Sequence, residues 1–260
     1  MNEVKVVTLE VRLQEMMDEG RIKPQTIWGY EKFLRRIDAV DNRIDRYEAE
    51  SRLFALESIN CRRSTIIALR AVWGVKLPIP RATPRRYNLP DEQSLRFVAM
   101  QSSHETRVLA MMYCGLRVSE AGALTGQQLR APDKLLIDRQ LIELNITPDS
   151  IGGKQRIIRI APPKNGIHEV IVPNWLQPRI QALTDTTLPG NLQKSLAKAS
   201  RKTGIKVNPH LLRHWLCTDL IAKGVPLPLV QKQMRHSDLK TTIGIYHEYN
   251  EDQLHGLYDT

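Results

Sequence analysis

A proline-rich stretch at residues 77–90, LPIPRATPRRYNLP, most constrains how this 260-residue chain can fold. It holds four prolines and three arginines, and its apolar residues follow no helical period. Proline fixes φ and removes a backbone donor, so the stretch is typical of extended chain between folded parts. The sequence therefore predicts a first domain at residues 1–76, a linker at 77–90 and a second domain at 91–260.

Helical patterns dominate on both sides of this linker. Apolar residues at positions 27, 30, 33, 34 and 37 follow one helix face, and residues 64–73 form a second helical pattern. Beyond the linker, helices are predicted at 91–101, 106–113 and 116–124, and the pattern is helical again from residue 174 onward.

The middle third of the chain has a different character. Residues 140–146, 154–163 and 167–173 are rich in Ile and Val and are bounded by Gly, Pro, Asn and Asp, which is typical of short strands. The last two are predicted to pair as a hairpin through a tight turn at residues 164–166, because Asn-Gly favours such turns. The expected fold class is mainly α with a small antiparallel β-sheet (α+β).

Charge and composition limit the possible partners. The chain carries 38 Lys and Arg against 28 Asp and Glu, a net charge of +10, which favours a polyanion such as nucleic acid but would also suit an acidic membrane surface. The N-terminus lacks the apolar core of a signal peptide, and no stretch approaches the ~20 apolar residues that cross a bilayer. We therefore expect a soluble, intracellular protein.

The three cysteines, at positions 61, 114 and 217, are odd in number and widely separated. They form no CxxC pair, which argues against a disulfide framework or a zinc ribbon. Each lies among apolar residues, so all three are expected to be small buried hydrophobes.

Five short pieces of the second domain contain residues suited to phosphate chemistry. They are Cys114–Glu120 (CGLRVSE), the turn that carries Lys164, His210–His214 (HLLRH), Met234–Ser237 (MRHS) and Thr241–Tyr246 (TTIGIY). His210 and His214 have the spacing of metal ligands on a helix, but the general-base glutamate of an HExxH motif is absent. Arg213 between them would also repel a cation, so no metal site is expected.

Taken together and in this order, the five pieces resemble the tyrosine recombinase family of phage integrases and Xer-type recombinases. The detailed resemblance covers about residues 95–250. The family has an arginine in a Gly-Leu-Arg-x-x-Glu box, a lysine on a β-hairpin turn, a His-x-x-Arg pair, a further His or Trp, and a tyrosine about ten residues later. The matching residues are Arg117, Lys164, His210, Arg213, His236 and Tyr246.

This resemblance implies a division of catalytic work. Arg117 and Arg213 would bind the non-bridging phosphate oxygens, because guanidinium groups can stabilise their developing charge without a metal ion. His210 would assist proton transfer at the tyrosine, and His236 would hydrogen-bond the phosphate. Lys164 would protonate the leaving 5′-oxygen, and Tyr246 would form the covalent 3′-phosphotyrosine.

Two of these assignments have rivals within the sequence. Lys154 also precedes a strand, although Lys164 fits better because the strand after it ends in Val172-Pro173. Tyr249 lies three residues after Tyr246, but the ten-residue distance from His236 favours Tyr246. The sequence also departs from the family at Arg235, where a glycine is usual.

The resemblance further implies a helical core-binding domain followed by a catalytic domain in a DNA-clamp architecture. The expected partners are double-stranded DNA core sites, other copies of the chain in a tetramer on DNA, and an accessory directionality factor, with no cofactor and no membrane. Only about 75 residues precede the linker, so we expect a minimal integrase without an arm-binding domain, acting in the cytoplasm of a bacterial or archaeal host. A type IB topoisomerase-like enzyme and a catalytically silent DNA-binding protein of the same fold are the alternatives.

Overall fold

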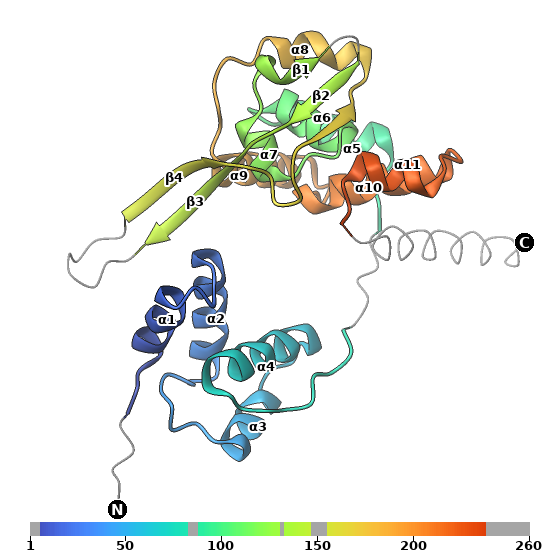
Figure 1. Cartoon of the computed structure of the whole chain (residues 1–260). Helices are drawn as coiled ribbons and strands as arrows, with labels where there is room; N and C mark the ends of the chain where they lie inside the picture. Colours follow the sequence, from blue (N-terminus) through green and yellow to red (C-terminus); the bar gives the residue numbers. More distant parts are fainter. Residues whose placement is uncertain (1–5, 83–87, 131–132, 147–154, 238–260) are drawn as a thin grey trace, which may run out of the picture. The chain divides into compact units, whose positions relative to one another are not determined.

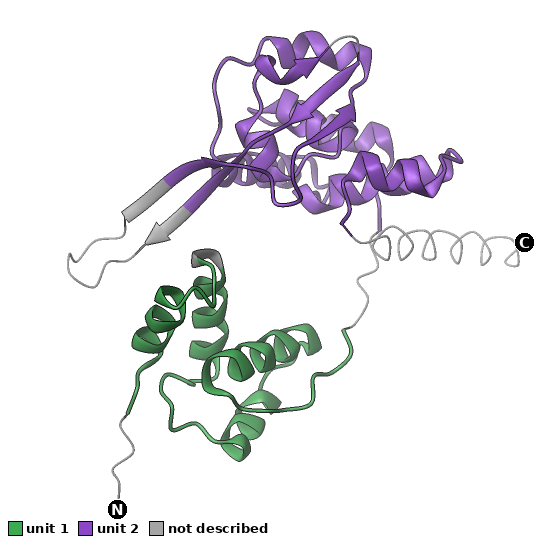
Figure 2. Cartoon of the chain, viewed as in Figure 1, with its two compact units in different colours: residues 1–85 green, residues 86–260 purple. Residues whose placement is uncertain are grey.

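The computed structural model describes residues 6–82, 88–130, 133–146 and 155–237. The chain divides into two compact units, residues 1–85 and residues 86–260 (Figure 2). The division falls inside the proline-rich stretch 77–90. Each unit has its own cluster of buried apolar side chains.

The first unit is a group of four helices (Figure 1): α1 (Leu9–Asp18), α2 (Pro24–Arg36), α3 (Arg46–Phe54) and α4 (Ile59–Trp73). The predicted helices at 26–37 and 64–73 are confirmed as α2 and α4. Two of the helix starts are capped, because the side chains of Asp45 and Ser58 accept backbone N–H groups in the first turns of α3 and α4. Leu9, Leu34 and Leu69 are fully buried between the helices.

Residues just after α4 pack onto this first unit. Leu77 is buried in its apolar core, and its carbonyl oxygen accepts a 2.8 Å hydrogen bond from Arg70 Nη2. The carbonyl oxygen of Pro80 accepts another 2.8 Å bond, from Arg63 Nη1. The beginning of the proline-rich stretch is therefore held by side chains of α4.

The second unit is also mainly helical. Its helices are α5 (Glu92–Met100), α6 (Glu105–Tyr113), α7 (Val118–Ala123), α8 (Gln177–Gln181), α9 (Pro189–Thr203), α10 (Pro209–Ala222) and α11 (Leu227–Met234). The predicted helices at 91–101, 106–113 and 116–124 are confirmed as α5, α6 and α7. Half of the residues of α10 are buried, and Leu212 and Cys217 on it have no exposed surface. Cys114 is buried as expected, whereas Cys61 is only partly buried.

The strands form two separate antiparallel sheets: β1 (Leu129–Arg130), β2 (Lys134–Ile137) and β5 (His168–Ile171) in one, and β3 (Gln140–Ile146) and β4 (Gln155–Ala161) in the other. The strands predicted at 140–146, 154–163 and 167–173 are confirmed as β3, β4 and β5. Figure 1 shows β3 and β4 extending together away from the helices of this unit.

The predicted pairing of the last two strands is wrong. β4 pairs with β3 along its whole length, from Gln140 opposite Ala161 to Ile146 opposite Gln155. β5 pairs instead with β2, which sequence reasoning missed, with Leu135 opposite Val170. The tight turn at residues 164–166 does form, since Gly166 N–H donates to the Pro163 carbonyl at 3.1 Å, but it connects two different sheets.

No helix in the described part of the chain is long and apolar enough to cross a membrane.

Candidate functional site

The α6–α7 junction positions Arg117. Gly115 there has φ +64°, and a Cβ at this position would lie 3.2 Å from both Leu216 Cδ2 and Met234 Sδ. Only glycine combines this backbone conformation with such close packing. Arg117 follows as the N-cap residue of α7, so its position is fixed by a helix start.

Glu120, in the first turn of α7, is a buried carboxylate that holds Arg117 twice. Its Oε2 accepts the Arg117 backbone N–H at 2.8 Å, and its Oε1 accepts Arg117 Nη1 at 2.8 Å. Burial by itself raises the pKa of Glu120, but the charge of Arg235 and the hydrogen bonds from Arg117 outweigh burial and lower the pKa overall. Glu120 therefore remains ionised at neutral pH.

Arg213 lies on the buried face of α10. Its Nη2 donates to the Met234 carbonyl at 2.7 Å, while its Nη1 has no hydrogen-bond partner among the described residues. Burial, followed by the charges of Arg235 and Arg117, lowers the pKa of Arg213 to about 9. The guanidinium is thus still charged at neutral pH, with one buried N–H group that has no acceptor in the described protein.

Arg235, the residue at which the sequence departs from the family, is buried within the same cluster. It ends α11 in the left-handed region with φ 53° and ψ 45°. Its Nη2 donates to Glu120 Oε2 at 2.7 Å and to the Gly115 carbonyl at 2.8 Å. Sequence reasoning did not include Arg235 in the site, although an arginine where glycine is usual was a visible signal.

His236 follows directly and lies in a strongly positive environment. Burial, together with the charges of Arg213, Arg117 and Arg235, lowers its pKa to about 4. His236 is therefore neutral at pH 7, so its ring offers one N–H donor and one acceptor.

The turn that carries Lys164 is tied to the same point. Asn165 Nδ2 donates to the Arg235 carbonyl oxygen at 2.8 Å, and His168 Nε2 lies 2.6 Å from the Asn165 carbonyl oxygen. Lys164 itself is exposed. The structure thus brings the loop of Lys164 to the end of α11, beside His236.

The remaining predicted residues are less closely tied to this cluster. His210 is exposed in the first turn of α10, one turn before Arg213, where the side chain of Asn208 caps the helix. Tyr246 and its rival Tyr249 lie outside the described residues, as does Lys154. The described structure therefore groups Arg117, Arg213, His236 and the Lys164 loop, and it places His210 on the same helix as Arg213.

Among the described residues, this cluster carries three arginine charges, from Arg117, Arg213 and Arg235, against the one carboxylate of Glu120. Such an excess of buried positive charge suits an anion with several oxygens, because guanidinium groups form paired hydrogen bonds with phosphate. Among the described residues, no group of three or more His, Cys, Asp or Glu side chains is arranged to hold a metal ion.

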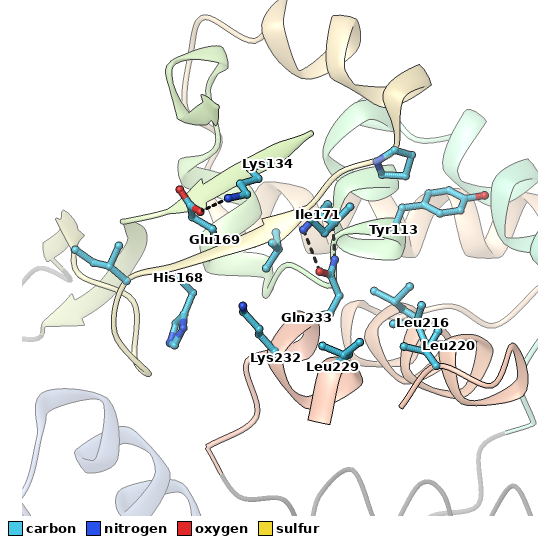
Figure 3. A pocket seen from close by; sticks show the side chains of 14 residues that line it. Tyr113, Lys134, His168, Glu169, Ile171, Leu216, Leu220, Leu229, Lys232 and Gln233 are labelled. Carbon is cyan, nitrogen blue, oxygen red and sulfur yellow. Dashed lines mark hydrogen bonds and ion pairs between the residues drawn. The ribbon is translucent and has the colours of Figure 1, made fainter. Parts of the chain in front are cut away.

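An apolar groove of about 800 Å³ lies nearby, between β5 and the helices α10 and α11 (Figure 3). Leu216, Leu220 and Leu229 form its apolar side. Gln233 closes one part of it by bonding both the N–H and the carbonyl group of Ile171, at 3.0 and 2.9 Å.

Comparison with known proteins places this chain in a family. The family model of the phage integrase family matches residues 89–253. A tyrosine recombinase of Pseudothermotoga lettingae is 26% identical over 200 residues, which are 72% of this chain and 64% of the relative. Tyrosine recombinase XerA of Pyrococcus horikoshii is 26% identical over 175 residues, covering 63% and 57%. The chain thus spans less than two thirds of the length of these relatives.

Solved structures share the fold. The Tn1549 transposon integrase, solved in complex with transposon right end DNA, aligns with a TM-score of 0.65 at 16% identity and covers 97% of this chain and 100% of that one. The XerH site-specific recombinase bound to a difH substrate aligns with a TM-score of 0.54 at 15% identity, covering 83% and 72%. The expected fold class, mainly α with small antiparallel sheets, is confirmed.

Proposed function

This chain belongs to the phage integrase family, and on that premise we propose that it is a site-specific recombinase of double-stranded DNA. It cuts and rejoins strands through a covalent 3′-phosphotyrosine at Tyr246. The observation that carries this proposal is the pairing of Arg117 with Arg213 in one cluster, where Arg213 Nη1 has no acceptor among the described residues. A phosphate oxygen supplies the acceptor that this buried N–H group requires.

The two arginines act on the scissile phosphate. Attack on the phosphorus increases the negative charge on its non-bridging oxygens, and preorganised guanidinium groups stabilise that charge more in the transition state than in the ground state. Glu120 keeps Arg117 in place, and the Met234 carbonyl keeps Arg213 in place. Neutral His236 adds a hydrogen bond to the phosphate without adding another charge.

The bond changes are balanced without a metal ion or ATP. Tyr246 Oη loses its proton with the help of His210 and forms a bond to phosphorus, and the bond from phosphorus to the 5′-oxygen breaks. The leaving oxygen takes a proton from Lys164, on the turn fixed by Asn165. Rejoining reverses these steps, with the 5′-hydroxyl of the same or another strand as the attacking group.

A suicide half-site, from which the short fragment with the free 5′-hydroxyl diffuses away after cleavage, tests this proposal. We expect the wild-type chain and Tyr249→Phe to form a covalent protein–DNA band, and Tyr246→Phe to form none. A covalent band that persists in Tyr246→Phe would show that the nucleophile is wrongly assigned. Relaxation of a supercoiled plasmid without a recombination site would instead indicate a topoisomerase.

Recombination of two duplexes calls for four active sites, so the proposed working form is a tetramer on core DNA sites. Leu254, Leu257 and Tyr258 have helical spacing in the tail of the sequence. The groove in Figure 3 offers the apolar surface on which such a tail from a neighbouring copy would dock.

The proposed biological role is integration or excision of a mobile element such as a phage, with an accessory protein setting the direction.

A further inference from the structure

We propose that Arg235 is a positioning residue of this phosphate-binding cluster, whose side chain fixes Arg117 through Glu120. The inference rests on the proposed recombinase function, which already assigns Arg117 and Lys164 to the reaction. Arg235 itself has no place in that chemistry, because its guanidinium faces Glu120 and backbone carbonyl groups.

The backbone conformation of Arg235 is unfavourable for its residue type. At φ 53° and ψ 45° an L-residue with a side chain loses roughly 1–2 kcal/mol relative to its preferred regions, whereas glycine loses almost nothing. The local turn would therefore form more easily with glycine. What the arginine provides must come from its side chain.

The side chain of Arg235 completes the surroundings of Glu120. Only 1% of each of the two side chains is exposed, and Arg235 Nη2 lies 2.7 Å from Glu120 Oε2. That same oxygen accepts the backbone N–H of Arg117, and the other carboxylate oxygen accepts Arg117 Nη1. Glu120 is thus held between two arginines, so its orientation, and with it that of Arg117, depends on both.

The main chain at this turn fixes three further groups. The Arg235 carbonyl oxygen accepts Asn165 Nδ2 at 2.8 Å, and Arg117 Nη2 lies 3.4 Å from the same oxygen. The preceding carbonyl, of Met234, accepts Arg213 Nη2 at 2.7 Å. By bonding the Gly115 carbonyl at 2.8 Å, the Arg235 side chain links this turn directly to the α6–α7 junction.

Stability alone is a weak explanation for such an ion pair. Two buried charges lose so much hydration that a well-packed apolar pair is often as stable or more stable. A buried pair does, however, impose one geometry, because each charge must meet its partner. The location of this pair, directly behind Arg117, indicates that geometry is what it contributes.

The test separates positioning from stability by measuring cleavage rate at saturating DNA, DNA affinity and melting temperature for each variant. Arg235→Gly keeps the left-handed turn and removes only the side chain. We expect the cleavage rate to fall by roughly 10- to 100-fold, since small misplacements of reacting groups have effects of this order. The dissociation constant for DNA should change by less than tenfold, which corresponds to about 1.4 kcal/mol. Arg179→Met, which breaks an exposed pair with Glu105, is the control and should leave all three unchanged.

Two further variants address a role in charge balance. Arg235→Gly/Glu120→Gln also removes the buried carboxylate that has lost one of its two arginine partners, so we expect it to recover melting temperature but not cleavage rate. Arg235→Lys keeps the charge but replaces the planar guanidinium, whose Nη2 bonds Glu120 and Gly115 and whose Nη1 lies 3.4 Å from the Cys114 carbonyl, by a single ammonium group, so its rate should also fall. Full cleavage in either variant would overturn the proposal.

A structural measurement does not depend on the reaction. In a crystal structure of Arg235→Gly, the guanidinium of Arg117 and the carboxylate of Glu120 should leave the positions they hold in the wild type, whereas Asn165 still has the main-chain carbonyl of residue 235 as its acceptor. If both keep those positions, the positioning role is wrong even where the wild type cleaves DNA. If the wild type forms no covalent complex, the recombinase proposal fails, and the crystal structure still decides the role of Arg235.

Discussion

At the scale of single residues, His236 illustrates how strongly the cluster controls charge. Burial of the ring lowers its pKa most, and the charges of three nearby arginines lower it further. In the unfolded chain the same ring has a pKa near 6.5. The folded and unfolded states therefore bind protons differently as the pH falls below this value.

This difference predicts a loss of stability in acid. Above about pH 7 the ring is neutral in both states, so it has no effect there. Between pH 6.5 and pH 4 the unfolded chain takes up a proton that the folded protein excludes, and folding should lose about 2–3 kcal/mol through this group. Urea unfolding at the two pH values measures this loss. Between pH 7.5 and pH 4.5, the free energy of unfolding should fall less for His236→Gln than for the wild type. Burial also lowers the pKa of His214, which both proteins retain, so that contribution cancels in the comparison. An identical pH dependence in the two proteins would contradict the assignment.

At the scale of secondary-structure elements, the helix that carries Arg117 is held from its far end. Arg107, buried on α6, donates to the carbonyl groups of Ala121 and Leu124 at 2.6 and 2.7 Å, and also to that of Asp185. Burial lowers the pKa of Arg107 to about 10, so the guanidinium remains charged at neutral pH. These bonds add a charged donor to carbonyl groups at the C-terminal end of α7, where a helix has no further turn of N–H groups to supply donors.

Replacing Arg107 with methionine should therefore destabilise the second unit by about 2–3 kcal/mol, because several buried carbonyl groups lose their donor. Arg179→Met is again the matched control, since it breaks an exposed ion pair of α6 that should contribute less than about 1 kcal/mol. Urea unfolding of residues 86–260 measures both variants. Equal effects would show that the buried donor does not stabilise α7.

At the scale of the whole molecule, the two units have separate cores, and the division between them is a testable boundary. Leu77 and the carbonyl groups of Leu77 and Pro80 belong to the first unit by their contacts. A fragment that ends at residue 76 lacks them, whereas a fragment that ends at residue 85 retains them.

We therefore expect the fragment 1–85 to be more stable than the fragment 1–76. Burial of a leucine side chain contributes roughly 1.5–3 kcal/mol, and the lost hydrogen bonds add to the difference. Thermal unfolding of the two fragments measures this difference in stability. Leu77→Ala in the longer fragment is the control for the loss of the side chain alone. Equal melting temperatures would mean that the domain ends before Leu77.

Local patterns in the sequence predicted the helices and three strands, because amphipathic periods and Asn-Gly turns are local signals. The pairing of β4 with β3 was not predictable in this way, since it depends on contacts between distant segments. β2 is only four residues long, and its partner β5 begins 34 positions after it starts. The motif residues were predicted from their order along the chain, but Arg235 was not, because its partner Glu120 lies 115 positions earlier.

The hydrogen bond from Asn165 to the Arg235 carbonyl has a consequence for how the parts of the site are held together. The peptide that accepts this bond is followed by His236 and, ten residues later, by Tyr246. The loop of the proposed acid, both arginines and the segment leading to the proposed nucleophile thus meet at a single turn. A displacement of that turn would therefore move the proposed acid loop and both arginines together.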